Sequence, residues 1–266
     1  MSKQTGGMLA QVRQQAIVDL VNQQGNITVN DLCSRFEVSP ATIRNDLRDL
    51  EARGSLKRTH GGAIGCNKSA YELNSYQKVV QSIDEKRAIA KAAMDFIHEG
   101  DAIALDSGTT TFEIAQLLMG FRDITVVTND LQIASWLERN TTVTVILVGG
   151  TVRRHFRCTT GQQAIDMLSI LHVDKAFIAA NGMSIEKGLT TPNVDMAGVK
   201  KKMLESADKV ILVADSSKIE RKAFASYAAI SQVDVLITDE HADNGFLEAL
   251  RETGTTVVSV EIDKNQ

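Results

Sequence analysis

The sequence is poor in cysteine, and this scarcity excludes several kinds of site. Its three cysteines, Cys33, Cys66 and Cys158, are odd in number, lie far apart and form no CxxC pair. Disulfide frameworks and structural zinc sites need even-numbered or closely spaced cysteines. We therefore expect reduced thiols in a cytoplasmic protein, with no disulfide and no metal site.

Long apolar runs are also missing. No apolar stretch approaches the ~20 residues that a membrane-spanning helix needs. The opening MSKQTGGMLAQ lacks the apolar core of a secretory signal. The chain has no GxGxxG after its first candidate strand of the α/β region and no GxxxxGK[ST], which disfavours dinucleotide or P-loop binding. We expect a cytoplasmic location, no membrane partner and no cofactor.

The net charge of −4 is distributed unevenly along the chain. Residues 1–68 hold nine Lys or Arg against six Asp or Glu, a balance of +3, whereas the remaining residues carry −7. A basic head on an acidic body indicates that only the head meets a polyanion. The alternative is that so short a segment becomes basic by chance.

Three helical patterns and a hairpin pattern fill residues 1–65. Apolar residues recur at helical spacing over 8–24, and Thr28 is a suitable N-cap for a second, short helix. Ser39 and the proline after it suit the start of a third helix that ends at Gly54. The stretch SLKRTHGGAIG then predicts two short strands around a Gly-rich bend. This order of elements is typical of a winged helix-turn-helix, a DNA-binding domain.

The third helix has one face suited to reading DNA. At about 100° per residue, Ile43, Leu47 and Leu50 fall on one side and should pack inward. The opposite side and its flanks carry small residues, an amide and guanidinium groups, which are the types that read major-groove base edges. The wing that follows is basic and can grip phosphates. The DNA-binding residues expected from this pattern are Ser39, Ala41, Thr42, Arg44, Asn45, Arg48, Lys57, Arg58, His60 and Gly61. The alternative is a solvated amphipathic helix followed by a basic turn.

A mostly polar stretch over 66–83 is interpreted as a linker, and strand-like and helix-like runs alternate after it. The strand candidates are DAIAL (101–105), ITVVT (124–128), VTVILV (143–148), KAFIAA (175–180), KVILVA (209–214), DVLIT (234–238) and TVVSV (256–260). This rhythm predicts an α/β domain over 84–266 with a mainly parallel, buried sheet.

Polar clusters follow the carboxyl ends of four of these strands, where α/β sheets form ligand sites. The loop LDSGTTT (105–111) can direct N–H and hydroxyl donors at a phosphate, with the positive end of the next helix behind it. Lys218 can add a cation, and Asp106 or Asn129 can hold sugar hydroxyls. The expected ligand-binding residues are Asp106, Ser107, Gly108, Thr109, Thr110, Thr111, Thr128, Asn129, Gly149, Gly150 and Lys218. The alternative for the loop is a helix N-cap with no ligand. Three arginines fit an anion contact and a solvated turn equally well: Arg153, Arg154 and Arg157.

The stretch VNDLCSRFEVSPATIRNDLRDLEARGSLKRTHGGA (29–63) resembles the N-terminal signature of the DeoR-type (DeoR/GlpR family) bacterial transcription regulators. The resemblance implies that this segment binds operator DNA, with the third helix in the major groove. Six later phrases are similar to the same family's C-terminal sensor: LDSGTTT (105–111), VVTND (126–130), LVGGTVRR (147–154), DKAFIAANG (174–182), KGLTT (187–191) and VADSSK (213–218). They imply a fold related to ribose-5-phosphate isomerase and effectors that are phosphorylated sugars or related metabolites. Asp195 stands where the family usually carries Glu, and the resemblance adds it to the expected effector site.

These observations lead to one main hypothesis, a sequence-specific DNA-binding regulator that represses a carbohydrate-utilisation operon and is relieved by a phosphorylated sugar or sugar-alcohol effector. Since one winged helix reads only a half-site, we expect a homo-oligomer, a dimer or a tetramer. We expect no enzymatic activity. The alternative is a sugar-phosphate isomerase-like enzyme with a DNA-binding head, which would need a base such as Asp106, Asp195 or Asp215. A nucleotide-sensing repressor and a DNA-binding scaffold with an inert body are further alternatives.

Overall fold

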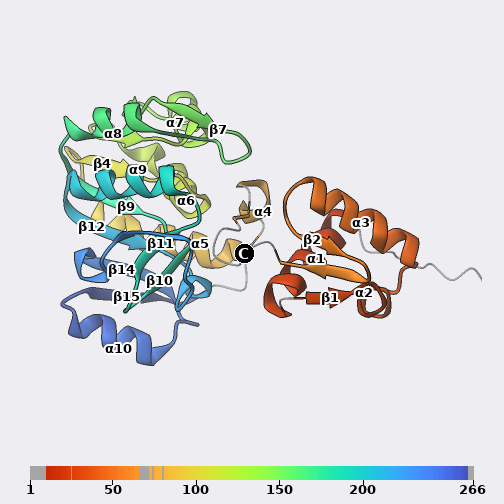
Figure 1. Cartoon of the computed structure of the whole chain (residues 1–266). Helices are drawn as coiled ribbons and strands as arrows, with labels where there is room; N and C mark the ends of the chain where they lie inside the picture. Colours follow the sequence, from red (N-terminus) through yellow and green to blue (C-terminus); the bar gives the residue numbers. More distant parts are fainter. Residues whose placement is uncertain (1–9, 25, 66–71, 74, 80, 263–266) are drawn as a thin grey trace, which may run out of the picture. The chain divides into compact units, whose positions relative to one another are not determined.

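The computed structural model describes residues 10–24, 26–65, 72–73, 75–79 and 81–262 (Figure 1). The chain divides into two compact units, Met1–Tyr71 and Glu72–Gln266. Within the described part of the chain, no helix is both long and apolar enough to cross a membrane. The same residues contain no group of three His, Cys, Asp or Glu side chains that could hold a metal ion.

The first unit is a winged helix. Its elements in chain order are α1 (Ala10–Gln24), β1 (Asn26–Thr28), α2 (Val29–Phe36), α3 (Pro40–Ala52), β2 (Lys57–Thr59) and β3 (Gly62–Ile64). The strands form an antiparallel sheet in the order β1-β3-β2. The three helices and the wing hairpin confirm the sequence interpretation. Strand β1 was not foreseen because three residues are too few to show an alternating pattern.

Side-chain caps set the starts of α2 and α3. The Thr28 hydroxyl accepts the N–H of Asp31, while the Asp31 carboxylate accepts the N–H of Thr28, so that α2 begins with a capping box. The Ser39 hydroxyl accepts the N–H of Thr42, and Pro40 occupies the first helical position of α3. Gly54 follows α3 with a φ of +71°, a conformation that glycine adopts without strain.

A buried polar contact joins α1 to α3. Ile43, Leu47 and Leu50 pack into the core as predicted, but Asp46 on the same helix is also buried. Its carboxylate accepts hydrogen bonds from Arg13 Nε at 2.6 Å and from the Gln14 amide at 3.1 Å. A buried carboxylate needs such partners, and the hydrophobic pattern alone did not reveal them.

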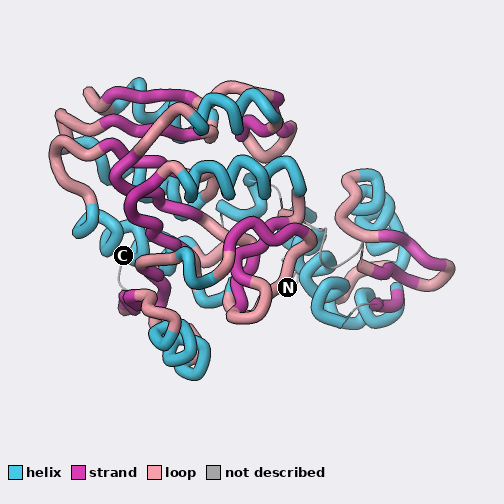
Figure 2. The backbone as a smooth tube through the Cα atoms, turned by 60° about the vertical axis from the view of Figure 1, so that its left-hand side comes forward, coloured by secondary structure: helices cyan, strands magenta, loops and turns pink. Residues whose placement is uncertain are grey.

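The second unit is built around a seven-stranded parallel sheet (Figure 2). Its strands, in spatial order, are β15 (Thr256–Val260), β14 (Val235–Asp239), β12 (Ala207–Val213), β9 (Val173–Ile178), β4 (Ala102–Leu105), β5 (Thr125–Thr128) and β6 (Thr144–Leu147). All seven correspond to strands expected from the sequence. The fold class, a winged helix-turn-helix followed by an α/β domain, is confirmed.

Helices cover both faces of this sheet. One face packs against α5 (Ile83–Ala93), α6 (Thr109–Leu117) and α7 (Leu131–Asn140). The other face packs against α8 (Gln162–Ser169), α9 (Val194–Glu205) and α10 (Asn244–Glu252). Successive strand residues point to opposite layers, since Ile103 and Leu105 belong to the first cluster and Ala104 to the second. Burial on both faces explains the continuous apolar runs in the sequence.

Smaller strands, short helices and turns complete the second unit. The remaining elements are α4 (Ser75–Val79), η1 (Met94–Phe96), η2 (Leu118–Gly120), the hairpin β7 (Thr151–Arg153) and β8 (Cys158–Thr160), the antiparallel strands β10 (Gly182–Ser184), β11 (Gly188–Thr191) and β13 (Ala225–Ala228), and the turns η3 (Ser216–Lys218) and η4 (Ile230–Gln232).

The stretch interpreted as a linker, 66–83, is divided in the structure. Residues 66–71, which include Cys66, lie outside the described residues, while 72–83 fall within the second unit. The sequence of this second part is mostly polar and shows no hydrophobic period that would reveal an element. Cys33 is half-buried and Cys158 is buried, and both are free thiols.

Candidate functional site

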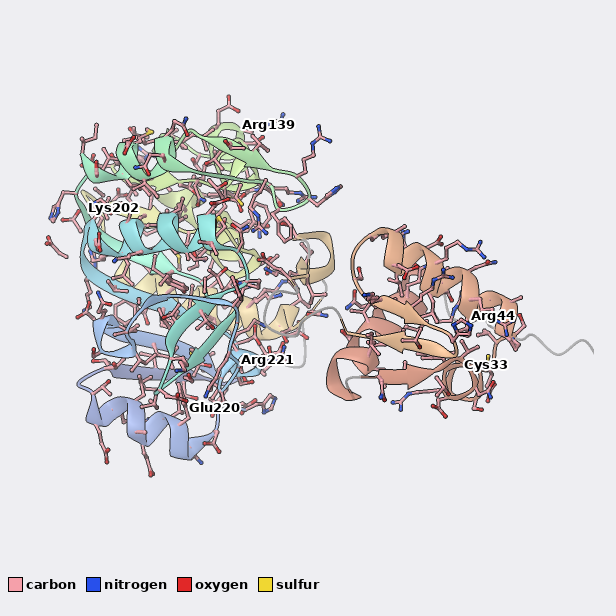
Figure 3. All side chains as sticks on the ribbon, viewed as in Figure 1. Cys33, Arg44, Arg139, Lys202, Glu220 and Arg221 are labelled. Carbon is pink, nitrogen blue, oxygen red and sulfur yellow. The ribbon has the colours of Figure 1, made fainter. Side chains whose placement is uncertain are left out.

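The outer face of α3 presents the expected DNA-reading residues to solvent. Ala41, Arg44, Asn45 and Arg48 are exposed, and Arg44 is labelled in Figure 3. The inward positions of the same helix are buried, so the helix has one apolar and one polar face. The arrangement offers an amide and two guanidinium groups on one side of an anchored helix.

Two of the expected contacts have structural partners of their own. The Ser39 hydroxyl caps α3 and lies 2.9 Å from the Thr42 hydroxyl. In the wing, Lys57, Arg58, His60 and Gly61 are all exposed, but Arg58 Nε lies 2.6 Å from the Glu51 carboxylate. The backbone N–H and the guanidinium of Arg58 both donate hydrogen bonds to the Glu51 carboxylate. These bonds lower the pKa of the Glu51 carboxyl. Arg58 must therefore leave or share Glu51 to contact a phosphate.

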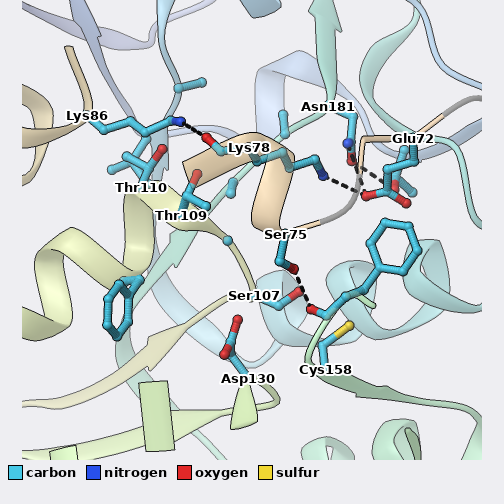
Figure 4. Close-up of a pocket in the computed structure, with 18 of the residues that line it drawn as sticks. Glu72, Ser75, Lys78, Lys86, Ser107, Thr109, Thr110, Asp130, Cys158 and Asn181 are labelled. Carbon is cyan, nitrogen blue, oxygen red and sulfur yellow. Dashed lines mark hydrogen bonds and ion pairs between the residues drawn. The ribbon is translucent and has the colours of Figure 1, made fainter. Parts of the chain in front are cut away.

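The second unit has a cavity, lined by many charged and polar residues as well as apolar ones, at the carboxyl ends of its central strands (Figure 4). The chain runs outward from β4 to β5 and β6 on one side, and from β9 to β12, β14 and β15 on the other. The cavity thus lies at the point where the strand order reverses, the usual place for ligands in open α/β sheets. Ser107 and Gly108 after β4, Ala179 and Asn181 after β9, and Asp215 after β12 all line it.

The loop after β4 turns donors toward this cavity. Ser107, Gly108, Thr109 and Thr110 line it. Helix α6 begins at Thr109, its N-cap residue Gly108 has no side chain, and the Gly108 N–H donates to the Asp130 carboxylate in the same cavity. The hydroxyl of Thr111 is turned inward, donating to the Asp106 carbonyl at 2.6 Å. The N-terminal end of α6, with its partial positive charge, therefore borders the cavity.

A buried ion pair supports the loop from below. Asp106 is fully buried and accepts hydrogen bonds from the backbone N–H groups of Ser107 at 2.8 Å and Ala179 at 3.0 Å. Lys200 on α9 pairs with the same carboxylate and donates to the Ala179 carbonyl at 2.9 Å. Asp106 thus joins the ends of β4 and β9. Its carboxylate is taken up by these contacts and is not free to hold a sugar hydroxyl, which is the role that the sequence had suggested for it. The Tyr227 hydroxyl donates to the same carbonyl at 3.1 Å.

Cations and carboxylates face each other across the cavity. Five cationic side chains line it: Lys78, Lys86, Arg153, Lys200 and Lys218. Three carboxylates line it as well: Glu72, Asp130 and Asp215. Lys218 Nζ lies 3.0 Å from Asp215, and Lys86 donates to the Lys78 carbonyl at 2.6 Å. The cations exceed the carboxylates among these side chains, which suits an anionic ligand.

Burial shifts the protonation of two of these groups. Burial lowers the pKa of Lys86 to about 8, because the nearby Asp215 does not fully compensate. Burial raises the pKa of Asp130 to about 6, although its carboxylate accepts the N–H groups of Gln132 and Ile133 at the start of α7. Burial also favours a higher pKa for Glu72 and Asp215. Lys78 and Arg153 outweigh burial at Glu72, and Lys218 outweighs it at Asp215, so the pKa of each carboxyl is lowered.

Several expected ligand residues do not reach the cavity. Thr128 and Asn129 are fully buried at the end of β5, where Thr128 accepts the Asp130 N–H and Asn129 donates to the Thr159 carbonyl. Gly149 and Gly150 follow the edge strand β6, away from the strand-order reversal. Asp195 is exposed on the first turn of α9, whereas Met196 and Lys200 occupy the side that lines the cavity.

Sequence reasoning missed most of the cavity's charged residues. Glu72 and Lys78 lie in the stretch interpreted as a linker, and Lys86 and Lys200 lie on helices without a recognisable motif. Of the three arginines left open, Arg153 lines the cavity with its guanidinium 3.8 Å from the Phe156 ring centroid, and Arg154 is exposed. The Arg157 guanidinium hydrogen-bonds the Gln132 side chain. No local sequence signal marks these placements.

Two family models together cover most of the chain. The DeoR-like helix-turn-helix domain matches residues 13–69, and the DeoR C terminal sensor domain matches residues 81–240. The HTH-type transcriptional regulator GlpR of Haloferax volcanii is 39% identical over 251 residues, which are 94% of this chain and 98% of that protein. The putative aga operon transcriptional repressor of Escherichia coli O157:H7 is 36% identical, with 93% of each chain covered.

A solved structure was also matched over about half of the chain. Ribose 5-phosphate isomerase A of Methanocaldococcus jannaschii has a TM-score of 0.39 and 16% identity, over 52% of this chain and 55% of that one. An overlap this small carries no argument about activity.

Proposed function

Since the chain belongs to the DeoR family of DNA-binding transcriptional regulators, we propose that the cavity of its second unit binds a phosphorylated sugar or sugar-alcohol effector. Binding of this effector weakens the grip of the first unit on operator DNA. The observation that carries the proposal is the N-terminus of α6, whose first residues line a cavity that five cations also line. A phosphate group needs both features, converging N–H donors and compensating positive charge.

The remainder of the cavity is suited to the carbon chain of a sugar. Hydroxyl and amide groups of Ser107, Thr109, Thr191 and Asn181 line it beside the charged side chains. Such groups both donate and accept hydrogen bonds, as sugar hydroxyls do. Phe112, Phe156 and Met196 supply apolar surface to the same lining. The mixture favours a small polyhydroxylated compound with an anionic end.

The proposed DNA contacts divide into two kinds. Arg44, Asn45 and Arg48 on the exposed face of α3 read base edges, with Ala41 allowing close approach. Lys57, Arg58, His60 and Gly61 in the wing hold phosphates. Ser39 and Thr42 serve mainly by fixing the start of the helix. Each chain carries one such reader, so a palindromic or repeated operator requires at least a dimer, and we propose a homo-oligomer.

The test of the effector site combines ligand binding with DNA release. Sugar phosphates and their dephosphorylated forms are compared by thermal shift, since a ligand that binds only the folded state raises the melting temperature. Compounds that bind are then added to operator-bound protein, and release is followed by fluorescence anisotropy. Only phosphorylated compounds should stabilise the protein and release DNA. Equal stabilisation by the dephosphorylated sugars would contradict the phosphate site.

A glycine in the loop provides a matched pair of variants. A Cβ atom at Gly108 would lie 3.2 Å from the Ala179 Cβ, so Gly108→Val crowds the phosphate loop. Gly120 belongs to the same unit and a Cβ there meets nothing within 4 Å, so Gly120→Val is the control. The Gly108 variant should keep operator affinity and lose effector response, while the control keeps both. The same preparations, tested for turnover of each sugar phosphate, address the isomerase alternative.

A further inference from the structure

Glu72 places a carboxylate where an anionic ligand would be expected. Its Oε1 atom accepts hydrogen bonds from Lys78 Nζ at 2.8 Å and Asn181 Nδ2 at 3.2 Å, and its Oε2 atom accepts one from Arg153 Nη2 at 2.9 Å (Figure 4). The side chain is only 10% exposed. Three donors of the cavity wall are therefore already occupied by an anion that belongs to the chain itself.

Polar contacts hold the segment that carries Glu72. The Ser75 N–H donates to the His155 carbonyl at 3.1 Å, and the Ser75 hydroxyl donates to the Phe156 carbonyl at 3.0 Å. Lys86 donates to the Lys78 carbonyl at the other end of α4. None of the described residues of 72–79 belongs to the apolar clusters on either face of the sheet. A segment whose described contacts are mainly polar opens at lower free energy than the sheet beneath it.

The charge of the cavity sets up a competition. With Glu72 in place, five cationic side chains of the lining face three carboxylates. A phosphate monoester brings up to two more negative charges next to Glu72. Like charges in a shared, partly buried site disfavour each other, and Lys78 and Arg153 cannot pair fully with both anions. A phosphate that accepts hydrogen bonds from these two cations must therefore displace the Glu72 carboxylate.

We propose that Glu72 is a built-in competitor for the effector, which takes Lys78 and Arg153 from its carboxylate and thereby frees residues 72–79. This inference rests on the proposed function, because it takes the cavity to be the effector site. The exchange makes and breaks only ion pairs and hydrogen bonds. The effector binds better to the state in which Glu72 is detached, so it shifts the population toward that state. This segment directly follows the DNA-binding unit in the chain. Its release is therefore the step through which effector binding changes the connection to the DNA-binding unit.

The first experiment measures the competition with inorganic phosphate as the probe. Full-length wild type and Glu72→Gln are titrated while the fluorescence of Trp136 is followed. Trp136 is the single tryptophan of the chain, and its ring lies 6.4 Å from that of Phe112, which lines the cavity. The variant should bind phosphate about tenfold more tightly, the factor expected when the open state is populated to roughly one part in ten in the wild type.

A matched control separates competition from a general change of charge. Glu186 belongs to the same unit and also pairs with a lysine, Lys222, at 2.6 Å, but it is exposed and lies outside the cavity lining. Glu186→Gln removes the same charge and should leave phosphate affinity unchanged. Equal phosphate affinity of wild type and Glu72→Gln would overturn the proposal, since Glu72 would then have no effect on binding. Weaker binding by the variant would also overturn it, since Glu72 would then organise the cations for the ligand.

The second experiment needs no variant and therefore does not depend on how Glu72→Gln folds. Hydrogen exchange of wild-type amides in 72–79 is measured with and without saturating phosphate. The Ser75 amide, which donates to His155, should lose protection when phosphate binds. Unchanged or increased protection would overturn the proposal.

The outcomes also separate this inference from the proposed function. Phosphate binding that is abolished by Gly108→Val but unaffected by Glu72→Gln refutes the competition alone. If neither wild type nor Glu72→Gln binds phosphate, the effector site itself is refuted and the competition with it.

Discussion

The two units use cationic side chains in opposite ways. On α3 and the wing, Arg44, Arg48 and Lys57 are exposed, whereas in the cavity Lys200 is buried and paired with Asp106, and Arg153 is mostly covered and paired with Glu72. Exposed cations attract a polyanion over a long range, and salt weakens that attraction. Cations removed from water need hydrogen-bond partners, and Lys200 and Arg153 both have a carboxylate in that role. The same residue types thus suit a long nucleic acid in one unit and the exchange of one small anion for another in the second.

Removing a buried cation should have the largest effect. Lys200→Met leaves Asp106, which is fully buried, without its ionic partner. We expect the free energy of unfolding to fall by about 3–5 kcal/mol, measured by urea denaturation. Lys201→Met is the control on the same helix, because Lys201 is exposed and lies 3.9 Å from Glu205. A loss of stability as small as that of the control would show that the buried pair is dispensable.

The next effect concerns Asp130 and depends on pH. Burial raises the pKa of this carboxyl from 3.8 to about 6. Below about pH 4 it is protonated in both the folded and the unfolded chain, and between about 4 and 6 only the folded chain keeps the proton. Stability contributed by this group therefore falls as pH rises through that window, by roughly 3 kcal/mol, and stays lower above it.

Asparagine at this position removes the charge and keeps an oxygen to cap α7. Asp130→Asn should therefore stabilise the protein by roughly that amount at pH 7 and have little effect at pH 4. Denaturant titrations at several pH values measure the difference between variant and wild type. The control is Asp243→Asn, at the exposed N-cap of α10. A difference that does not change with pH would show that Asp130 is not the titrating group.

Changes on the DNA-reading face should alter recognition without altering stability. Arg44→Ala or Asn45→Ala removes a base contact, which should lower discrimination between operator and scrambled DNA by about 1–3 kcal/mol. Both residues are exposed, so the urea midpoint should stay within error of the wild type. Binding to both duplexes at one salt concentration is the measurement. Unchanged preference in both variants would rule out α3 as the reader.

The wing should show the smallest effect. Arg58 shares an exposed ion pair with Glu51, and such pairs contribute about 0–1 kcal/mol. Arg58→Ala should weaken binding to all sequences alike and reduce the slope of log affinity against log salt by roughly 0.9, the value for one phosphate contact. Glu51→Gln should act in the opposite direction by releasing Arg58. A change in which operator bases are preferred would assign base reading to the wing.

The helix caps, the hydrophobic periodicity and the strands of this protein can be predicted from the sequence, because they depend on residues that are close together in the chain. Thr28 and Asp31 are three residues apart, as are Ser39 and Thr42. The continuous apolar runs of the strands reflect burial on both faces of the sheet. The loop after β4 was legible for the same reason, since its small and hydroxyl residues form one continuous stretch between a strand and a helix.

The charged residues that line the cavity could not be predicted from the sequence, because their ion pairs join distant parts of the chain. Lys200 and Asp106 are 94 residues apart, and Arg153 and Glu72 are 81 residues apart. The expected effector contacts at Asn129, Gly149 and Asp195 rest on strand ends and family phrases. Which strand ends meet depends on the order of strands in the sheet, and which side of a helix faces the cavity depends on how that helix packs.

The sequence by itself determined the two folded units, the exposed face of α3 that we propose reads DNA and the loop after β4 that we propose holds a phosphate, since local hydrogen bonds and hydrophobic periodicity decide how each of these folds. Only the tertiary structure decided which charges share the cavity. The reversal of strand order between β4 and β9 brings the ends of those strands together, and the packing of α4 and α9 adds Glu72, Lys78 and Lys200 to the same cavity. Partial burial then makes their pairing obligatory, because a charge removed from water requires a partner of opposite sign.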